Sequence, residues 1–195
     1  MSGQRNDIVD WAEITLTHRC NQRCFFCYED GRDLAREPSL DEVKRILDET
    51  AKHAEQVVLC GLEVLLRHDV FDIVAYGRSL GLRVAVFTNG QLLAKPGLVG
   101  RLADAGCNSI VVSVHFPDRE VFERAARARA DGFDKMLKGL GNVAAYLREH
   151  PGALDLATES DMFVLNAGRL IEMRQTLLDA LGDCPWSMRL GSLLP

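Results

Sequence analysis

Strand-like and helix-like segments alternate along all 195 residues, and this alternation constrains the fold more than any other feature of the sequence. Short runs rich in β-branched and apolar residues, bounded by turn residues, predict strands. The expected strands cover residues 12–17, 56–60, 83–88, 109–115, 154–157 and 187–190. A repeat of roughly 30 to 40 residues per strand and helix indicates parallel βαβ crossovers, with helices covering the sheet.

Helix-start signals lie between these strands. Ser39 followed by Glu42 has the pattern of a capping box, in which each side chain bonds the backbone of the other residue. Asp69 is expected to cap a second helix, which Gly81 ends. Apolar spacing predicts further helices over residues 97–105, 133–149 and 169–181.

The expected strands and helices add up to five βα units and a sixth parallel strand. A complete eight-stranded barrel takes about 250 residues, so the prediction is an α/β fold with an open, partial TIM-like barrel. We expect a single domain over residues 1–195, with an N-terminal arm over 1–11 and the partial barrel over 12–195. Functional groups in such folds gather at the carboxyl ends of the strands.

Composition restricts the partners and the location of the protein. The 47% of apolar residues is enough for a packed core, and the net charge of -5 leaves no basic excess for binding nucleic acid or a membrane surface. The N-terminus lacks a secretory signal, and no apolar run approaches the roughly 18 residues of a membrane span. Six cysteines are too few for a disulfide-stapled secreted domain, so we expect a cytoplasmic protein.

Three cysteines directly follow the first expected strand. Cys20, Cys24 and Cys27 form a C-x3-C-x2-C array, whose chance expectation at this cysteine content is on the order of 0.005. Four-iron clusters normally have four cysteine ligands, so three thiolates would leave one iron open to a substrate or cofactor. The alternative is a zinc-binding scaffold, whose structural site needs a fourth ligand such as His18 or Cys60.

The array resembles the C-x3-C-x-aromatic-C motif of the radical S-adenosylmethionine (SAM) superfamily, with Phe26 at the aromatic position. The segment T-L-T-H-R-C-N-Q-R-C is similar to the branch that includes the molybdenum-cofactor enzyme and the peptide-modifying, sulfatase-maturing enzymes. The resemblance implies a 4Fe–4S cluster on Cys20, Cys24 and Cys27, with SAM on the open iron. It also implies an electron donor such as flavodoxin or ferredoxin, and reductive cleavage of SAM to a 5′-deoxyadenosyl radical. That radical abstracts hydrogen from a substrate, for which a peptide or protein is a candidate.

The resemblance extends to a turn after the second strand. The family's Gly-Gly-Glu-Pro turn, which contacts the SAM amino group, is matched here at Gly61 and Glu63. The sequence departs from it at Leu62 and Val64, and Leu62 puts a side chain where backbone must approach SAM closely. These departures motivate an alternative, a non-catalytic or SAM-cleavage-impaired iron-sulfur module that acts with a partner.

Further SAM contacts are implied at the ends of later strands. The sequence F-T-N-G places Thr88 and Asn89 at the mouth of the barrel. Ser113 matches a serine that binds the ribose or methionine part of SAM, and Arg124 matches an arginine that pairs with its carboxylate. His115 shares a strand face with Ser113 and is a candidate for substrate contact or proton transfer, because an ordinary histidine pKa lies near neutrality. A structural histidine is the alternative.

The other three cysteines do not extend the motif. Cys107 is expected to be a buried apolar residue, Cys184 stands alone, and Cys60 either lines the site or packs in the core. The chain stops soon after the sixth strand, without the cysteine-rich extension of many peptide-modifying relatives. We therefore expect either a minimal stand-alone enzyme or a core domain.

Overall fold

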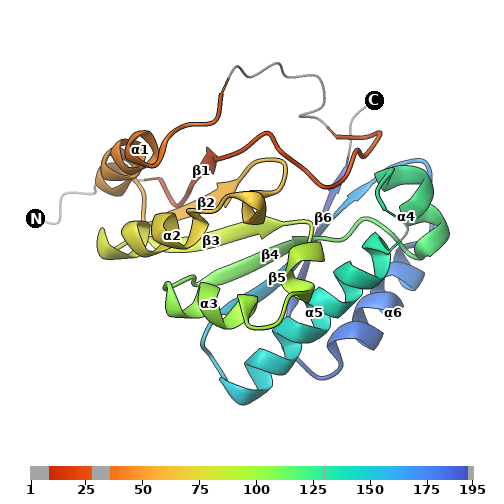
Figure 1. Ribbon diagram of the computed structural model, residues 1–195. Helices are drawn as coiled ribbons and strands as arrows, with labels where there is room; N and C mark the ends of the chain where they lie inside the picture. The colour runs from red at the N-terminus through yellow and green to blue at the C-terminus, as the bar shows by residue number, and fades with distance from the viewer. Residues whose placement is uncertain (1–8, 28–35, 130, 193–195) are drawn as a thin grey trace, which may run out of the picture.

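The computed structural model describes residues 9–27, 36–129 and 131–192, and within these ranges six parallel strands form one sheet (Figure 1). The sheet follows chain order from β1 to β6. Its strands are β1 (Ala12–Thr15), β2 (Gln56–Cys60), β3 (Arg83–Thr88), β4 (Ser109–Ser113), β5 (Asp155–Met162) and β6 (Ser187–Ser192). The α/β fold with a partial, open barrel is confirmed. Residues 1–8 of the expected N-terminal arm lie outside the described residues.

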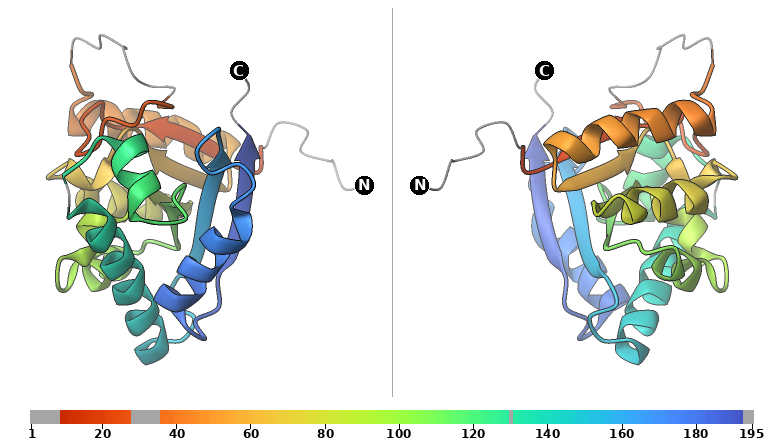
Figure 2. Two further views of the ribbon diagram at one scale, coloured as in Figure 1. Left: turned by 90° about the vertical axis from the view of Figure 1, so that its right-hand side faces the viewer. Right: turned by 90° about the vertical axis from the view of Figure 1, so that its left-hand side faces the viewer.

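Helices line the outer face of the curved sheet, as Figure 2 shows from two sides. They are α1 (Leu40–His53), α2 (Val70–Ser79), α3 (Leu98–Asp104), α4 (Arg119–Ala126), α5 (Gly132–Glu149) and α6 (Leu170–Leu181), with short 3-10 helices η1 (Val64–Leu66) and η2 (Gln91–Ala94). The sequence patterns indicated a solvated helix surface over residues 124–131 without bounds for α4, and they did not predict η1 and η2. None of the helices in the described ranges is long and apolar enough to cross a membrane.

The capping-box prediction is confirmed, and Asp69 occupies the predicted N-cap position of α2 but its side chain does not cap the helix. The Ser39 side chain accepts the Glu42 amide, and the Glu42 side chain accepts the Ser39 amide at the start of α1. Asp69 makes no side-chain cap, because its carboxylate accepts two bonds from Arg67, of 2.8 and 2.7 Å. The buried Arg67 also donates to the Leu16 carbonyl at 2.8 Å. The pair therefore ties the end of β1 to the segment before α2.

β5 extends well beyond the predicted segment 154–157. Its second half, from Thr158 to Asp161, is polar and carries no apolar signal for a strand. The strand forms because both neighbours pair with it, Val112 opposite Thr158 on one side and Met188 opposite Thr158 on the other. Pairing with β4 and β6 thus stabilises the extended conformation of residues whose own strand propensity is low.

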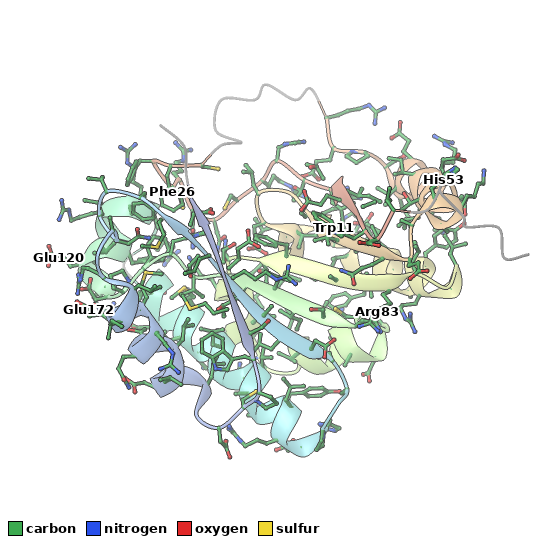
Figure 3. All side chains as sticks on the ribbon, turned by 180° about the vertical axis from the view of Figure 1, so that it is seen from behind. Trp11, Phe26, His53, Arg83, Glu120 and Glu172 are labelled. Carbon is green, nitrogen blue, oxygen red and sulfur yellow. The ribbon has the colours of Figure 1, made fainter. Side chains whose placement is uncertain are left out.

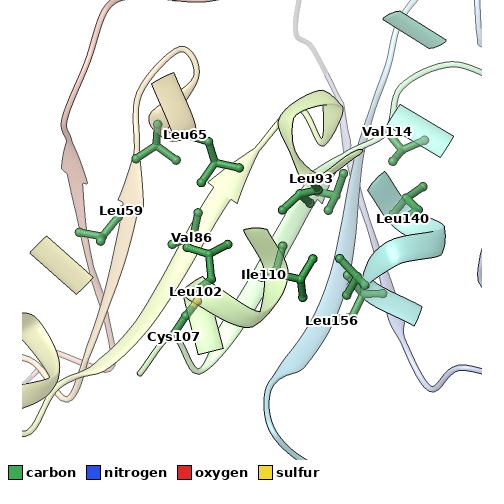
Figure 4. Packing of buried hydrophobic residues seen from close by; sticks show 14 of the residues in the cluster. Leu59, Leu65, Val86, Leu93, Leu102, Cys107, Ile110, Val114, Leu140 and Leu156 are labelled. Carbon is green, nitrogen blue, oxygen red and sulfur yellow. The ribbon is translucent and has the colours of Figure 1, made fainter. Parts of the chain in front are cut away.

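The apolar core lies between the sheet and the helices. Leu59, Val86, Ile110 and Leu156 project from successive strands toward this layer (Figure 4). Side chains alternate along each strand, so the other set faces the concave inner side of the sheet. That inner side encloses a cavity of about 970 Å³.

Helix α5 packs closely against the backbone before η2, and this contact gives a stability prediction. A Cβ atom on Gly139 would lie 2.2 Å from the Gly90 carbonyl oxygen, whereas a Cβ on Gly141 would meet nothing closer than 3.8 Å. We expect Gly139→Ala to lower the free energy of unfolding by about 1–3 kcal/mol, the usual cost of overpacking. Gly141→Ala should be neutral or stabilise by up to about 1 kcal/mol, since alanine is the better helix former. Urea unfolding of both variants measures this, and equal effects would contradict the close contact.

Candidate functional site

The segment that carries the cysteines prolongs the pairing of β1 with β2 beyond the ends of both strands. Three backbone hydrogen bonds connect it to the turn after β2. They join the Leu16 amide to the Cys60 carbonyl (2.8 Å), the Leu62 amide to the Thr17 carbonyl (3.0 Å) and the Glu63 amide to the Arg19 carbonyl (2.9 Å). The start of the cysteine loop, residues 18–27, is therefore fixed at the carboxyl end of the sheet.

Gly61 makes this close approach possible. Its φ of 129° lies in the region that favours glycine, and a Cβ atom there would lie 2.4 Å from the Thr17 carbonyl oxygen. The glycine that matches the family's turn therefore has a structural role here, since it lets two backbones pair.

The far end of the cysteine loop is attached to α4. The amides of Arg23 and Phe25 donate to the carbonyls of Ala126 (2.8 Å) and Ala125 (3.0 Å), which end that helix. The last carbonyls of a helix lack partners within the helix, so the loop satisfies them. The sequence could not indicate this contact, because it involves backbone groups of residues with no distinctive side chains.

Cys20, Cys24 and Cys27 lie half-buried on this loop. The pKa of the Cys20 thiol is raised to about 11 and that of Cys24 to about 12, mainly by burial and in part by charge on neighbouring cysteines. Cys20 and Cys24 are thus within electrostatic range of Cys27. A positively charged metal centre would stabilise all three thiolates.

The donor set consists of three thiols on one loop, which is the kind of ligand that iron-sulfur clusters use. Among residues 9–27, 36–129 and 131–192, no three His, Cys, Asp or Glu side chains are grouped closely enough to hold one metal ion. In an iron-sulfur cluster each thiolate binds a different iron. The three thiols fit the cluster on this chemistry.

An amide network holds the cysteine loop against the end of β3. Asn89 donates to Asn21 at 2.7 Å and approaches the Cys20 sulfur at 3.8 Å. Asn21 in turn donates to Gln91 at 3.0 Å. The side-chain nitrogens of Gln22 and Gln91 are buried without a partner in the described part of the chain. Both N–H groups are therefore free to donate hydrogen bonds to a ligand bound at this site.

Glu63 connects the turn after β2 to the end of β3. Its buried carboxylate accepts from the Thr88 hydroxyl (2.8 Å) and from the amides of Asn89 (2.8 Å) and Leu65 (3.0 Å). Burial raises the pKa of Glu63, and these three donors oppose the shift. The Glu63 side chain thus positions the turn, and Thr88 serves the same purpose. Their contacts with SAM stay predictions.

Val64 and Leu62, the two departures from the family's turn, have different surroundings. Val64 starts η1 and is fully buried in the core, so its apolar side chain serves packing. Leu62 is half-buried, and its amide is engaged by Thr17.

Phe26 belongs to an aromatic cluster that the sequence indicated only in part. It stacks on Phe163 with ring centroids 4.3 Å apart and meets the His115 ring edge at 5.1 Å. Buried Asn166 donates to the carbonyls of His115 and Asp161, both at 2.8 Å, and so fixes the segment that carries Phe163. Phe163 and Asn166 belong to no motif and were missed.

His115 is neutral in this environment. Burial lowers its pKa to about 4, and the charge on Asp161 opposes this shift. The ring Nδ1 accepts the Asp161 amide at 2.9 Å, so the ring proton resides on Nε2. The pKa of His115 therefore departs from the ordinary histidine value near neutrality, because the ring is buried against Phe26 and Phe116. Its role toward a substrate stays a prediction.

Ser113 and Arg124 lie in different settings. Ser113 ends β4 and follows the alternation of Ser109 and Val111, which line the inner cavity. Arg124 is exposed on α4, where it pairs with Glu120 at 3.5 Å. Its predicted role toward SAM thus has no support from its present contacts.

The other three cysteines are not part of the cysteine loop. Cys107 and Cys184 are buried in the core cluster. Cys60 is half-buried at the carboxyl end of β2, 3.9 Å from the Thr15 hydroxyl.

The pairing at Gly61 gives a second prediction. Gly61→Ala should destabilise the protein by about 1–3 kcal/mol more than Gly81→Ala, because both glycines have positive φ but only Gly61 faces a backbone atom within clash distance. Gly61→Ala should also lower iron incorporation during anaerobic reconstitution. Urea unfolding and iron analysis of the two variants test this, and normal iron content in Gly61→Ala would count against the role of the pairing.

The His115 environment gives a third prediction. Unfolded chains protonate this histidine near pH 6.5 and the folded chain only near pH 4, so its contribution to stability is lost as pH falls through this window. Between pH 7 and 5 the loss should reach about 2 kcal/mol. In His115→Asn this component should disappear, so the stability difference between the two proteins should change with pH. A difference independent of pH in chemical unfolding would show that His115 is not held neutral.

The comparisons with known proteins agree with this geometry. The Radical SAM superfamily model matches residues 14–154. A Thermococcus kodakarensis protein named "Probable GTP 3′,8-cyclase" is 32% identical over 163 residues, which are 82% of this chain and 50% of that protein. The Fe-coproporphyrin III synthase of Methanosarcina barkeri is 31% identical over 144 residues, 72% of this chain and 35% of that protein. The chain thus spans half or less of the length of these curated relatives.

A solved structure shows the same fold. Streptococcus suis SuiB bound to precursor peptide SuiA superposes with a TM-score of 0.74 at 17% identity, covering 94% of this chain and 40% of SuiB. The resemblance carried by the cysteine motif is confirmed by the family match. The chain therefore belongs to the radical SAM superfamily, whose cofactors are a 4Fe–4S cluster and SAM.

Proposed function

We propose that this chain is the cluster- and SAM-binding core of a radical SAM enzyme. The observation that carries the proposal is the cysteine loop, fixed at one end to the turn after β2 and at the other to α4. Cys20, Cys24 and Cys27 bind the 4Fe–4S cluster and leave one iron for SAM. When bound, the cluster and SAM supply the one-electron chemistry that yields a 5′-deoxyadenosyl radical, which takes a hydrogen atom from the substrate.

The residues around the cysteines tune and shield the cluster site. The Gln22 amide donates to the Cys20 sulfur at 3.3 Å, and Asn89 approaches the same sulfur. Hydrogen bonds to cluster sulfurs affect the reduction potential, so both donors contribute to it. Phe26 and Phe163 form an apolar wall beside the loop, which limits the access of water.

SAM is held by the turn after β2 and by the later strand ends. The amides of Leu62 and Glu63 are already engaged with Thr17 and Arg19, so this turn would offer carbonyl oxygens to the SAM amino group. Ser113 contributes from β4. Arg124 pairs with the SAM carboxylate after leaving its exposed contact with Glu120, which costs little because surface ion pairs are weak.

The partners follow from this chemistry. Reduction of the cluster requires an electron donor, for which flavodoxin or ferredoxin is suited. The substrate class is open between two kinds of known protein. The curated relatives above are named for small-molecule reactions, whereas SuiB is bound to a precursor peptide.

Anaerobic reconstitution with iron and sulfide, followed by dithionite and SAM, tests the proposal. The wild-type chain should bind about four iron atoms and release 5′-deoxyadenosine. Cys20→Ser, Cys24→Ser and Cys27→Ser should each lose most of the cluster and the product. Cys184→Ser, a buried cysteine in the core, is the control and should keep both.

Two outcomes would contradict the proposal. A full cluster without 5′-deoxyadenosine would favour the non-catalytic iron-sulfur module suggested by Leu62. Colourless protein that holds zinc on the same cysteines would favour a zinc scaffold, because zinc lacks the visible absorption of iron-sulfur clusters.

A further inference from the structure

The concave inner side of the sheet encloses the cavity of about 970 Å³, referred to below as the lumen. Inner side chains from all six strands line it. Among them are Glu13 on β1, Glu159 on β5 and Arg189 on β6. Figure 3 views the molecule from behind and labels Trp11 and Arg83, which also line the lumen, and Glu120 and Glu172 on the outer helices.

Most charges of the lumen neutralise one another near the amino ends of the strands. Arg83 pairs with Asp155 at 3.3 Å, and Arg148 pairs with Asp183 at 3.9 Å. Within the part of the chain that the structure describes, Glu13, Glu159 and Arg189 form no ion pair of 4.0 Å or less. Glu159 and Arg189 are direct neighbours across the β5–β6 pairing. These three side chains are therefore available to a ligand.

Glu13 on β1 and Glu159 on β5 both line the lumen, although three strands separate β1 from β5 in the sheet. Burial is the largest cause that raises the pKa of Glu159. The charges of Asp161 and Glu13 also raise this pKa, and the charge of Arg189 lowers it. Charge on Glu13 reaches Glu159 because the sheet curves. The carboxylates outnumber the single uncommitted guanidinium, so the lumen favours a cation.

Aromatic side chains add a second feature that suits a cation. Trp11, Phe87 and Trp186 line the same lumen as Glu13 and Glu159. The faces of aromatic rings attract ammonium groups, with indole the strongest. Carboxylates combined with aromatic walls match a positively charged nitrogen and oppose a polyanion.

We propose that the lumen selects a substrate that carries a protonated amine, held by Glu13 and Glu159 beside the aromatic walls. This inference rests on the proposed function, which places the radical chemistry at the carboxyl ends of the same strands. Arg189 sets an upper limit on cation affinity, because its charge repels the amine. The carboxylates of the lumen repel the negative charge of a nucleoside triphosphate.

Tryptophan fluorescence measures this binding directly, because both tryptophans of the chain line the lumen. Spermidine is the cationic probe and GTP the anionic one, each added to the cluster-reconstituted protein without dithionite. Spermidine should give a saturable change in fluorescence, and GTP none. Glu13→Gln and Glu159→Gln should each weaken spermidine binding about ten-fold, and Arg189→Gln should strengthen it. Glu172→Gln, on the outer helix α6, is the matched control and should bind as wild type.

Three results would overturn the inference. These are no response to spermidine, unchanged affinity in both lumen glutamate variants, and GTP binding as tight as that of spermidine. Thermal unfolding of each variant confirms that the fold is kept. SAM cleavage is assayed separately, so that amine binding without SAM cleavage counts against the proposed function alone. SAM cleavage without amine binding counts against this inference alone.

Discussion

The pairing of the cysteine loop with the turn after β2 is the interaction on which the site depends. Three backbone hydrogen bonds prolong the β1–β2 pairing, and Gly61 permits the approach because any side chain would meet the Thr17 carbonyl. Glu63 then connects this turn to Thr88 and Asn89 at the end of β3, and Asn89 reaches back to the cysteine loop. These contacts hold the cysteine loop at the carboxyl end of the sheet.

The fold was predictable where the pattern is local. β2, β3 and the capping box of α1 match the predicted bounds and contacts, because apolar runs and cap residues act over a few positions. The polar half of β5 was not predictable, since two neighbouring strands impose it. Asp69 has the signature of a cap, but the buried Arg67 competes successfully for its carboxylate.

The candidate site was likewise predictable only where its signal is local in the sequence. Cysteine spacing is a local signal, and it led to the correct superfamily. Asn166, Phe163 and the carbonyls that end α4 carry no signal, because their contacts join residues distant in sequence. The pKa of His115 likewise depends on packing that no motif records. The same sheet thus carries two different groups of side chains. Thiols and amides lie at the carboxyl ends of its strands, and paired charges line the cavity on its concave side.

Electron paramagnetic resonance of the reduced, reconstituted protein, recorded with and without SAM, tests the central claim most directly. Three cysteines on the fixed loop leave one iron open, so SAM should bind to the cluster itself. The account predicts a 4Fe–4S signal whose g values shift when SAM is added. A full-intensity cluster signal that SAM leaves unchanged would contradict it.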